Sequence, residues 1–217
     1  MASEQEFTML NIYHDLMVEA KARMLSINAL TNDQRGIPSP LVYEYGVLQI
    51  RMSCEIIGLA CLIAHGDLVS QAKADLRKTY APGQILAELG QMHDDFYPVP
   101  MRPEKTANGW HFAEYNGGPY LAKSEVAGIW ARCGDVLHRG HVKKLLKAKN
   151  PVQKNFLDLQ EWGQKIINLL NNHRIVTFDR RLAFICMLED GNGDVKVALG
   201  EAPSPEQADL GLRGDAA

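Results

Sequence analysis

The chain has 217 residues, of which 46% are hydrophobic, and its formal net charge at pH 7 is -3. This length suits one ordinary domain with an appendage, and the apolar share can form a sizeable core without disulfide or metal staples. The charge excludes a whole-molecule attraction to nucleic acid, so any site for a polyanion must come from a local cluster of basic residues.

Apolar side chains spaced by three and four residues predict two long helices at the start of the chain. The first covers about residues 4–30, and Ser3 with Glu6 matches the pattern of a capping box at its beginning. The second covers about residues 39–65 and is apolar around most of its girth. We therefore expect the second helix to lie centrally in a bundle.

The middle of the chain is less regular. Two shorter helices are predicted at residues 70–78 and 83–92, and the periodicity then stops between residues 94 and 120, a segment rich in proline and aromatic residues. Long insertions are often functional, and the aromatic content argues against disorder. We expect the insertion to pack over the bundle, with a short strand near residues 110–114.

Regular structure returns in the last third of the chain. A helix is predicted from Ser124 to a glycine stop at Gly140, and a last helix starts at Asn150-Pro151 and continues to about residue 172. Strand-like apolar runs follow, and two of them flank a strong turn signal at residues 190–194. These runs predict a C-terminal β-meander.

The predicted fold class is therefore mainly α, a four- to five-helix antiparallel bundle with a long proline- and aromatic-rich insertion and a small C-terminal β-meander. The expected organisation is a bundle over residues 1–172 with an irregular insertion at 94–120, a meander appendage at 173–200 and a disordered tail at 201–217. The four cysteines lack a C-x-x-C pair, which favours reduced, buried thiols. The sequence has neither a signal-peptide pattern nor an uninterrupted apolar run of about 18 residues, which predicts a cytoplasmic protein without a membrane span.

The main functional clue is the segment Arg132-Cys-Gly-Asp-Val-Leu-His138-Arg-Gly-His141. On an ideal helix, Arg132 and His138 point to different faces, so they converge only where the helix ends near Gly140. An arginine can hold a phosphate through two parallel hydrogen bonds, and a histidine of ordinary pKa, about 6.5, exchanges protons at neutral pH. Together they suit metal-free cleavage of a phosphodiester. In the alternative, Arg132 is a solvated side chain and His138 stabilises a helix C-terminus.

A basic stretch follows this pair directly, and no acidic residue lies between His138 and Lys149. Such residues can follow a nucleic-acid backbone. The candidates for nucleic-acid binding are Arg139, His141, Lys143, Lys144 and Lys147. The alternative is a solvated helix face without a ligand.

Arg132, the five residues that separate it from His138, and the following Arg-Gly, on the penultimate long helix, resemble the R-x(4–6)-H motif of the HEPN superfamily. The resemblance covers roughly residues 4–172, while the motif itself occupies only residues 132–140. Members of that family are four- to five-helix bundles, often dimeric, and many are metal-independent RNA endonucleases of toxin, CRISPR or phage-defence systems. Others are non-catalytic binding modules. The resemblance thus implies a toxin- or defence-type endoribonuclease or, as the alternative, a non-catalytic interaction or nucleotide-binding module.

The resemblance also implies roles for single residues. Arg132 would bind the scissile phosphate, and His138 would act on the ribose 2′-hydroxyl or on the leaving oxygen. Active members usually have a polar residue after the arginine, where this chain has Cys133. An acidic residue from an earlier helix often joins the motif, and Glu55 is the candidate, paired either with Arg132 across the bundle or with Arg51 on its own helix.

The implied partners are RNA, a second copy of the chain, and an antitoxin or other protein. The sequence lacks H-E-x-x-H and paired cysteines, so we expect no metal site and no cofactor. The remaining candidates for metal ligands are His138 with His141, three residues apart, and His65 and His93, each within two residues of an aspartate.

Overall fold

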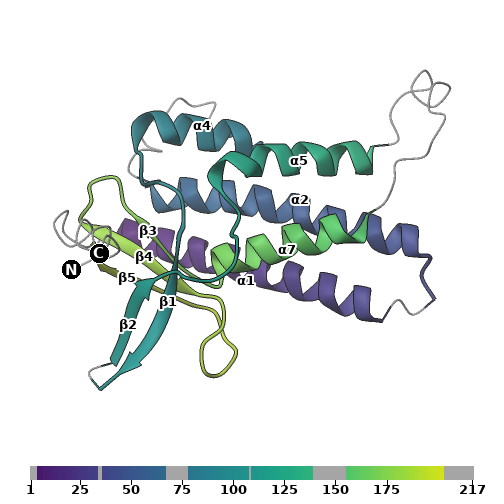
Figure 1. Cartoon of the computed structure of the whole chain (residues 1–217). Coiled ribbons are helices and arrows are strands. Elements are labelled where there is room, and N and C mark those ends of the chain that lie inside the picture. The colour runs from purple at the N-terminus through teal and green to yellow at the C-terminus, as the bar shows by residue number, and fades with distance from the viewer. Residues whose placement is uncertain (1–3, 34–35, 67–77, 108, 139–154, 203–217) are drawn as a thin grey trace, which may run out of the picture.

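The computed structural model describes residues 4–33, 36–66, 78–107, 109–138 and 155–202. Within these residues the fold combines helices with an antiparallel five-stranded sheet (Figure 1). The described helices are α1 (Glu4–Asn32), α2 (Ser39–Ala64), α4 (Pro82–Met92), α5 (Lys123–Leu137) and α7 (Phe156–Leu170). The strands are β1 (Val99–Thr106), β2 (Gly109–Glu114), β3 (Asn172–Val176), β4 (Leu182–Met187) and β5 (Lys196–Glu201).

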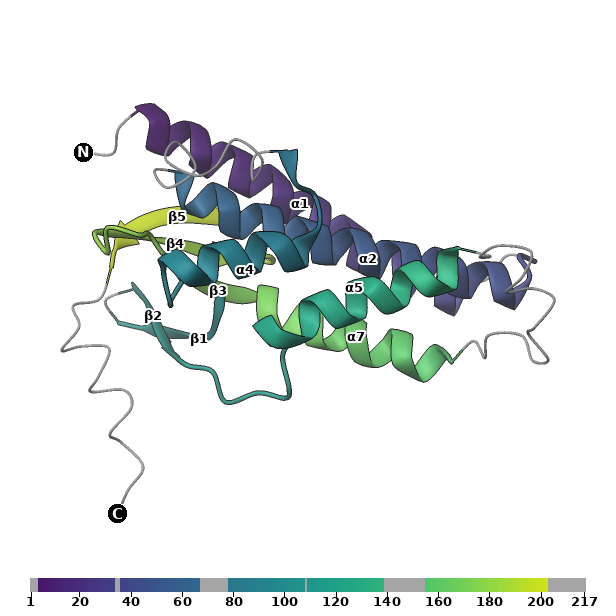
Figure 2. The same cartoon turned by 90° about the horizontal axis from the view of Figure 1, so that it is seen from above.

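The helix α2 is the central element of the bundle, as its sequence predicted. It packs against α1, α4, α5 and α7, and Figure 2 shows it between α1 on one side and α4 with α5 on the other. By length and composition α2 could cross a membrane, but 67% of its most apolar window is buried inside the protein. This degree of burial is typical of a core helix.

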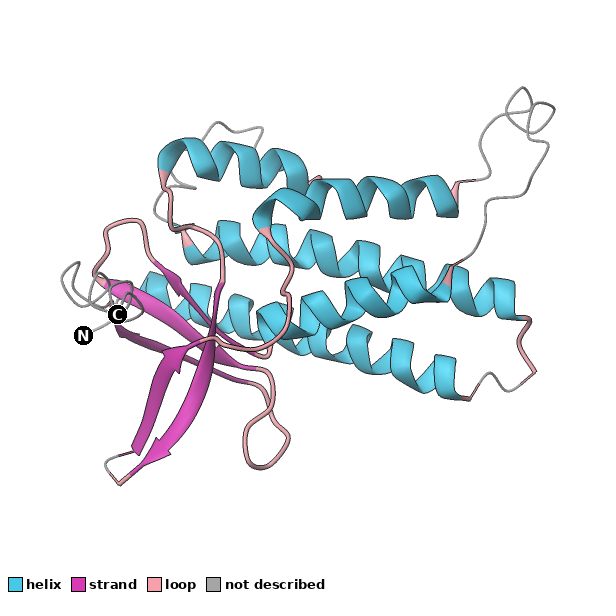
Figure 3. Cartoon of the chain, in the orientation of Figure 1, coloured by secondary structure: helices cyan, strands magenta, loops and turns pink. Residues whose placement is uncertain are grey.

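The sheet corrects the prediction of an irregular insertion at residues 94–120. The strand order is β2-β1-β3-β4-β5, so the predicted meander is confirmed as β3–β4–β5, and a hairpin from the insertion extends it. β1 pairs with β2 from Met101 to Thr106 and meets β3 only at Val99 and Pro100. Proline cannot donate a ladder hydrogen bond, which suits a strand with one largely unpaired side. The result is a mixed fold, with the sheet at one end of the helices (Figure 3).

The sheet and the helices share one hydrophobic core, because Ile175, Phe184 and Cys186 on the inner face of the sheet are buried with the helices. A buried polar pair lies at this junction. His173 Nδ1 lies 2.8 Å from the Leu170 carbonyl and donates to it, so Nε2 accepts from the Tyr13 hydroxyl at 2.5 Å. Complete burial lowers the pKa of His173 to about 4, and the ring is therefore neutral at pH 7.

Several predicted boundaries shift. α5 ends at Leu137 rather than at Gly140, and α7 begins at Phe156 because Asn155 is its N-cap, with a side chain that accepts from the Leu157 N–H at 3.1 Å. Glu201, expected in the tail, belongs to β5. The predicted helix at 70–78 and the tail beyond 202 lie almost entirely outside the described residues. The prediction of buried, unpaired thiols is confirmed for all four cysteines.

Candidate functional site

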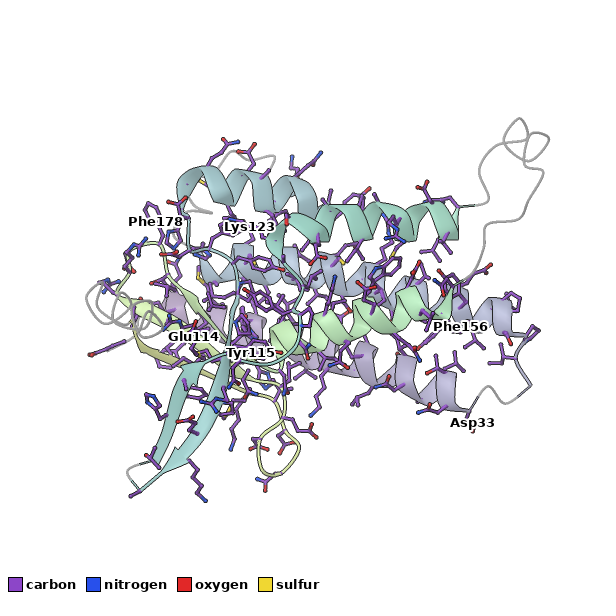
Figure 4. All side chains as sticks on the ribbon, viewed as in Figure 1. Asp33, Glu114, Tyr115, Lys123, Phe156 and Phe178 are labelled. Carbon is purple, nitrogen blue, oxygen red and sulfur yellow. The ribbon has the colours of Figure 1, made fainter. Side chains whose placement is uncertain are left out.

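The motif-bearing helix α5 is held to α7 near both of its ends. At its start, the Glu125 carboxylate accepts from the Ala122 N–H at 3.0 Å and pairs with Lys165 of α7 at 2.8 Å. Near its end, Arg132 pairs with Asp158 of α7 at 3.1 Å. The start of α7 carries Phe156 (Figure 4). The Phe156 ring meets the ring of Tyr43 of α2 edge-on, at 5.4 Å between centroids. The end of α5 is thus a positioned site rather than a loose helix terminus.

The Arg132 side chain is exposed to solvent, and two contacts with α7 still hold it in one orientation. Its side chain is 60% exposed, one of its terminal N–H groups donates to Asp158 Oδ2, and its guanidinium carbon lies 4.7 Å from the centroid of the Trp162 ring. Trp162 itself is buried, so the Arg132 guanidinium packs against a ring that the protein interior holds in place. Of the five N–H donors of an arginine, the described residues engage one, which leaves donors for an external anion.

His138 lies at the point where α5 stops. It is the C-cap residue, with φ -92° and ψ 118°, and its backbone N–H closes the helix on the Gly134 carbonyl at 2.9 Å. This extended conformation takes the side chain out of helical register, as convergence with Arg132 requires. The imidazole is exposed, and no described residue forms a hydrogen bond with it.

Of the two partners that the sequence offered for Glu55, the structure shows Arg51 and not Arg132. The Glu55 Oε1 atom lies 3.5 Å from Arg51 Nε one turn earlier on α2, as the alternative predicted, and it accepts from Trp130 Nε1 at 2.7 Å. The Arg51 guanidinium stacks on the Trp130 ring at 3.9 Å. Trp130 and Arg132 are two residues apart and thus on nearly opposite sides of α5. The Glu55 carboxylate therefore lies on the side of α5 that faces α2.

The contact between α2 and α5 also depends on a glycine. A Cβ atom at Gly134 would lie 2.6 Å from the Arg51 guanidinium, closer than real Cβ contacts. The side-chain exposures of Arg51 and Glu55 are only 18% and 15%. A half-buried carboxylate with two donors is a structural group, since its partners replace lost hydration.

The predicted nucleic-acid-binding residues lie outside the part of the chain that the structure describes. They are Arg139, His141, Lys143, Lys144 and Lys147. In the sequence they follow His138 immediately and belong to the most basic stretch of the chain.

The structure brings His65 and His93 together, but around a backbone carbonyl. Their ring centroids are 5.2 Å apart, and their Nε2 atoms lie 3.0 and 3.4 Å from the Val176 oxygen. Burial lowers the pKa of His65. Asp95 pairs with Arg180 instead of joining these rings. Within the described ranges, no group of three potential metal ligands forms.

A cavity of about 480 Å³ lies between α1 and α7. Its walls combine apolar side chains with amides and a hydroxyl, among them Met24, Asn28, Thr31, Gln160 and Ile167. Neither Arg132 nor His138 lines it, because the cavity lies on the far side of α7 from Asp158. The motif residues Arg132 and His138 therefore lie on the surface and not in this cavity.

Sequence reasoning missed two residues that define the environment of Arg132, namely Asp158 and Trp162. Their spacing of four residues puts both on one face of α7, and the antiparallel course of α5 brings that face to Arg132. The i,i+4 spacing was visible in the sequence, but the face of α7 that packs against α5 was not.

No protein-family model matches the chain, and neither a curated protein nor a solved structure matches it.

Proposed function

We propose that the chain is a HEPN-like, metal-independent RNA endonuclease that acts through Arg132 and His138 at the end of α5. The observation that carries the proposal is the combination of accessibility and orientation at this helix end. Arg132 is 60% exposed on a buried tryptophan, and the exposed His138 leaves the helix six residues later. The polar groups on the other side of α5 are already satisfied by one another.

The chemistry that fits this pair is transesterification within RNA. Arg132 binds a non-bridging phosphate oxygen and offsets the charge that develops on it. The neutral imidazole of His138 takes the proton of the 2′-hydroxyl while the 2′-oxygen bonds to phosphorus. The bond from phosphorus to the 5′-oxygen breaks, and the imidazolium returns the proton to that oxygen. A 2′,3′-cyclic phosphate and a 5′-hydroxyl result, and atoms and charges balance.

The basic stretch gives this site its substrate class. Arg139, His141, Lys143, Lys144 and Lys147 continue the chain from His138 and supply charge for the phosphates that flank the reacting one. RNA is favoured over DNA because the nucleophile is the 2′-hydroxyl. The toxin or defence setting and the cytoplasmic location follow from the family resemblance and the sequence pattern, as parts of the same proposal.

The test is cleavage of single-stranded RNA in EDTA. We expect cleavage by the wild type and a rate about 10²- to 10⁴-fold lower for His138→Ala, the usual contribution of a general acid or base. The matched control is His111→Ala, since His111 is an exposed histidine on β2. Equal rates for wild type and His138→Ala would refute the catalytic role.

One observation favours a second function, a non-catalytic RNA- or nucleotide-binding module. The Asp158 carboxylate already occupies one edge of the Arg132 guanidinium at 3.1 Å, and it repels a phosphate. A module of this kind would bind RNA but leave it intact. Salt-dependent RNA binding by wild type without cleavage, and with weaker binding by Arg132→Ala, would favour this second function.

A further inference from the structure

The cavity of about 480 Å³ between α1 and α7 has an uncharged lining. We call it the α1–α7 groove, and it is bounded by residues 24–32 of α1 and 156–167 of α7. Both helices pack against α2, and the groove reaches the end of the bundle away from the sheet, where Figure 4 shows Phe156. Charged residues make up 23% of the chain, yet none of the described residues that line the groove is charged. The groove therefore suits an uncharged ligand.

Each wall of the groove carries two side-chain amides, one helical turn apart. Asn28 and Asn32 lie on α1, and Gln160 and Gln164 lie on α7. Among the described residues, Gln164 donates to Asn168 at 2.8 Å, and the other three amides form no side-chain hydrogen bond. A side-chain amide both donates and accepts, as a peptide group does. The two walls thus offer rows of donors and acceptors to a ligand between them.

Apolar side chains form the floor of the groove. Met24, Ile27 and Leu159 line it and are buried. Leu159 packs directly on Gly46 of α2, so the floor rests on the central helix of the bundle. Gly163 lies between the two glutamines of α7 and adds no side chain, which leaves space above the floor. A pocket with an apolar base and a few convergent polar groups is the usual form of a ligand site.

We propose that the α1–α7 groove binds a segment of a partner protein in an extended conformation, with uncharged, apolar side chains at alternate positions. The spacing of the amides carries this proposal. One helical turn of four residues rises about 6 Å, and two residues of an extended chain span about 6.6 Å. Each row of amides therefore matches the peptide groups that an extended segment presents on one side. Alternate side chains of the segment then point to the apolar floor, and the others point to solvent.

The dimensions of the groove set the length of the bound segment. Residues 24–32 of α1 span about 12 Å, and residues 156–167 of α7 span about 16 Å. An extended chain rises about 3.3 Å per residue. The groove therefore accommodates four or five residues, of which two can direct apolar side chains to the floor.

A helical segment and RNA fit the groove less well. In a helix the backbone N–H and C=O groups pair with each other, so they cannot use the amides of the walls. RNA binding depends mainly on cations that contact phosphates, and the described lining has none. The inference does not rest on the ribonuclease proposal, because neither Arg132 nor His138 lines the groove.

The first experiment titrates the isotope-labelled full chain with the peptide acetyl-Ser-Leu-Ser-Leu-Ser-amide and follows the side-chain NH₂ signals of Asn28 and Gln160 by NMR. We expect saturable shifts, with a dissociation constant of about 1 mM or tighter. The same peptide with both leucines N-methylated keeps its side chains but lacks two N–H donors, and it should bind at least about tenfold more weakly. Single-stranded RNA should leave both signals unchanged. Absence of saturable peptide binding, equal binding of the methylated peptide, or shifts of these signals by RNA would each overturn the proposal.

A second experiment fills the groove without disturbing the fold. A Cβ atom at Gly163 would meet only Ile50, at an ordinary 3.9 Å, and leucine favours a helix more than glycine does, so Gly163→Leu should fold. Its side chain occupies the groove, and we expect peptide binding to weaken at least about tenfold, because the floor is then covered. The matched control is Gly128→Leu, at a glycine of α5 where a Cβ atom would meet nothing within 4 Å, and it should bind the peptide as the wild type does. Urea unfolding verifies that both variants are folded. Unchanged binding by folded Gly163→Leu would exclude the groove as the peptide site.

Discussion

Arginine, tryptophan and a carboxylate meet twice along α5, once on each side of the helix. On the side of α2, Arg51 stacks on Trp130 at 3.9 Å and pairs with Glu55. On the side of α7, Arg132 stacks on Trp162 at 4.7 Å and pairs with Asp158. The side-chain exposure of the arginine is 18% in the first cluster and 60% in the second. We name them the Arg51 cluster and the Arg132 cluster.

The two clusters contain the same kinds of residue, so the exposure of the arginine decides whether it stabilises the fold or can bind a ligand. In the Arg51 cluster each polar group replaces lost hydration of another, so that removal of one leaves a half-buried donor without an acceptor. In the Arg132 cluster, water can replace any partner, and the ion pair adds little stability. The donors of Arg132 are therefore available to a phosphate, whereas those of Arg51 are committed to the fold.

The largest effect that we expect lies in the core between the two clusters and the sheet, where His173 makes stability depend on pH. The pKa of His173 is about 4 in the folded chain and about 6.5 when unfolded, so the unfolded state binds more protons between these values. Stability is thus complete above pH 6.5 and is lost as pH falls towards 4. We expect a loss of about 3 kcal/mol in the free energy of unfolding.

Urea unfolding at pH 7, 5.5 and 4 measures this loss. His173→Gln, which keeps an acceptor for Tyr13, should lower stability at pH 7 but flatten most of the decline below pH 6.5. His111→Gln, at an exposed histidine of β2, should keep the wild-type decline. A decline of full size in His173→Gln would show that His173 is not the cause of the acid sensitivity.

Removal of the two carboxylates gives the most direct comparison of the clusters. Glu55→Ala should lower the free energy of unfolding by about 2–3 kcal/mol, because Trp130 Nε1–H and Arg51 lose their acceptor in a half-buried place. Asp158→Ala should cost less than about 1 kcal/mol, as exposed ion pairs do. Chemical denaturation at pH 7 measures both. Equal losses would show that exposure does not separate the clusters.

Substitution of Arg132 should affect RNA binding, and substitution of Arg51 should affect the free energy of unfolding. Arg132→Ala should weaken RNA binding about tenfold, the loss expected for one well-placed arginine, with a change in unfolding free energy below about 1 kcal/mol. Arg51→Ala should do the reverse, with about 2 kcal/mol of lost stability and unchanged RNA affinity. Fluorescence anisotropy with labelled RNA at one fixed salt concentration measures the affinities. Weaker binding by the folded Arg51→Ala variant would mean that RNA binds on the side of α5 that faces α2, and it would contradict the proposed site.

Much of the fold follows from local signals, and the exceptions have a clear cause. The helices and the C-terminal meander were predictable because their apolar periodicity is strong and their turn signals are local. The strand expected near residues 110–114 is confirmed as β2, but its partner β1 was missed because Pro100 and Pro103 break the usual strand pattern. Asn108-Gly109 was an available turn signal for the hairpin. How far β1 would pair with β3 was beyond local reasoning, since that pairing depends on the whole sheet.

The candidate site was predictable in its residues but only partly in its contacts. The position of His138 at a helix end follows from the glycine signal at Gly140, and the pairing of Glu55 with Arg51 follows from i,i+4 spacing. The contacts of Arg132 depend on which face of α7 meets α5. That orientation results from packing of the whole bundle, which single-sequence periodicity does not specify.

The smallest expected effect tests whether Asp158 helps or hinders Arg132. Asp158→Asn keeps an oxygen that can accept from the guanidinium and removes the negative charge beside the phosphate site. We expect the free energy of unfolding to change by less than about 0.5 kcal/mol and RNA affinity to rise about threefold, because repulsion at an exposed site is weak. Anisotropy titrations of wild type and Asp158→Asn over a series of salt concentrations measure this difference, which salt should diminish. Weaker binding by Asp158→Asn would mean that the charge of Asp158 holds Arg132 in its binding orientation. In both clusters the carboxylate would then serve to position the arginine.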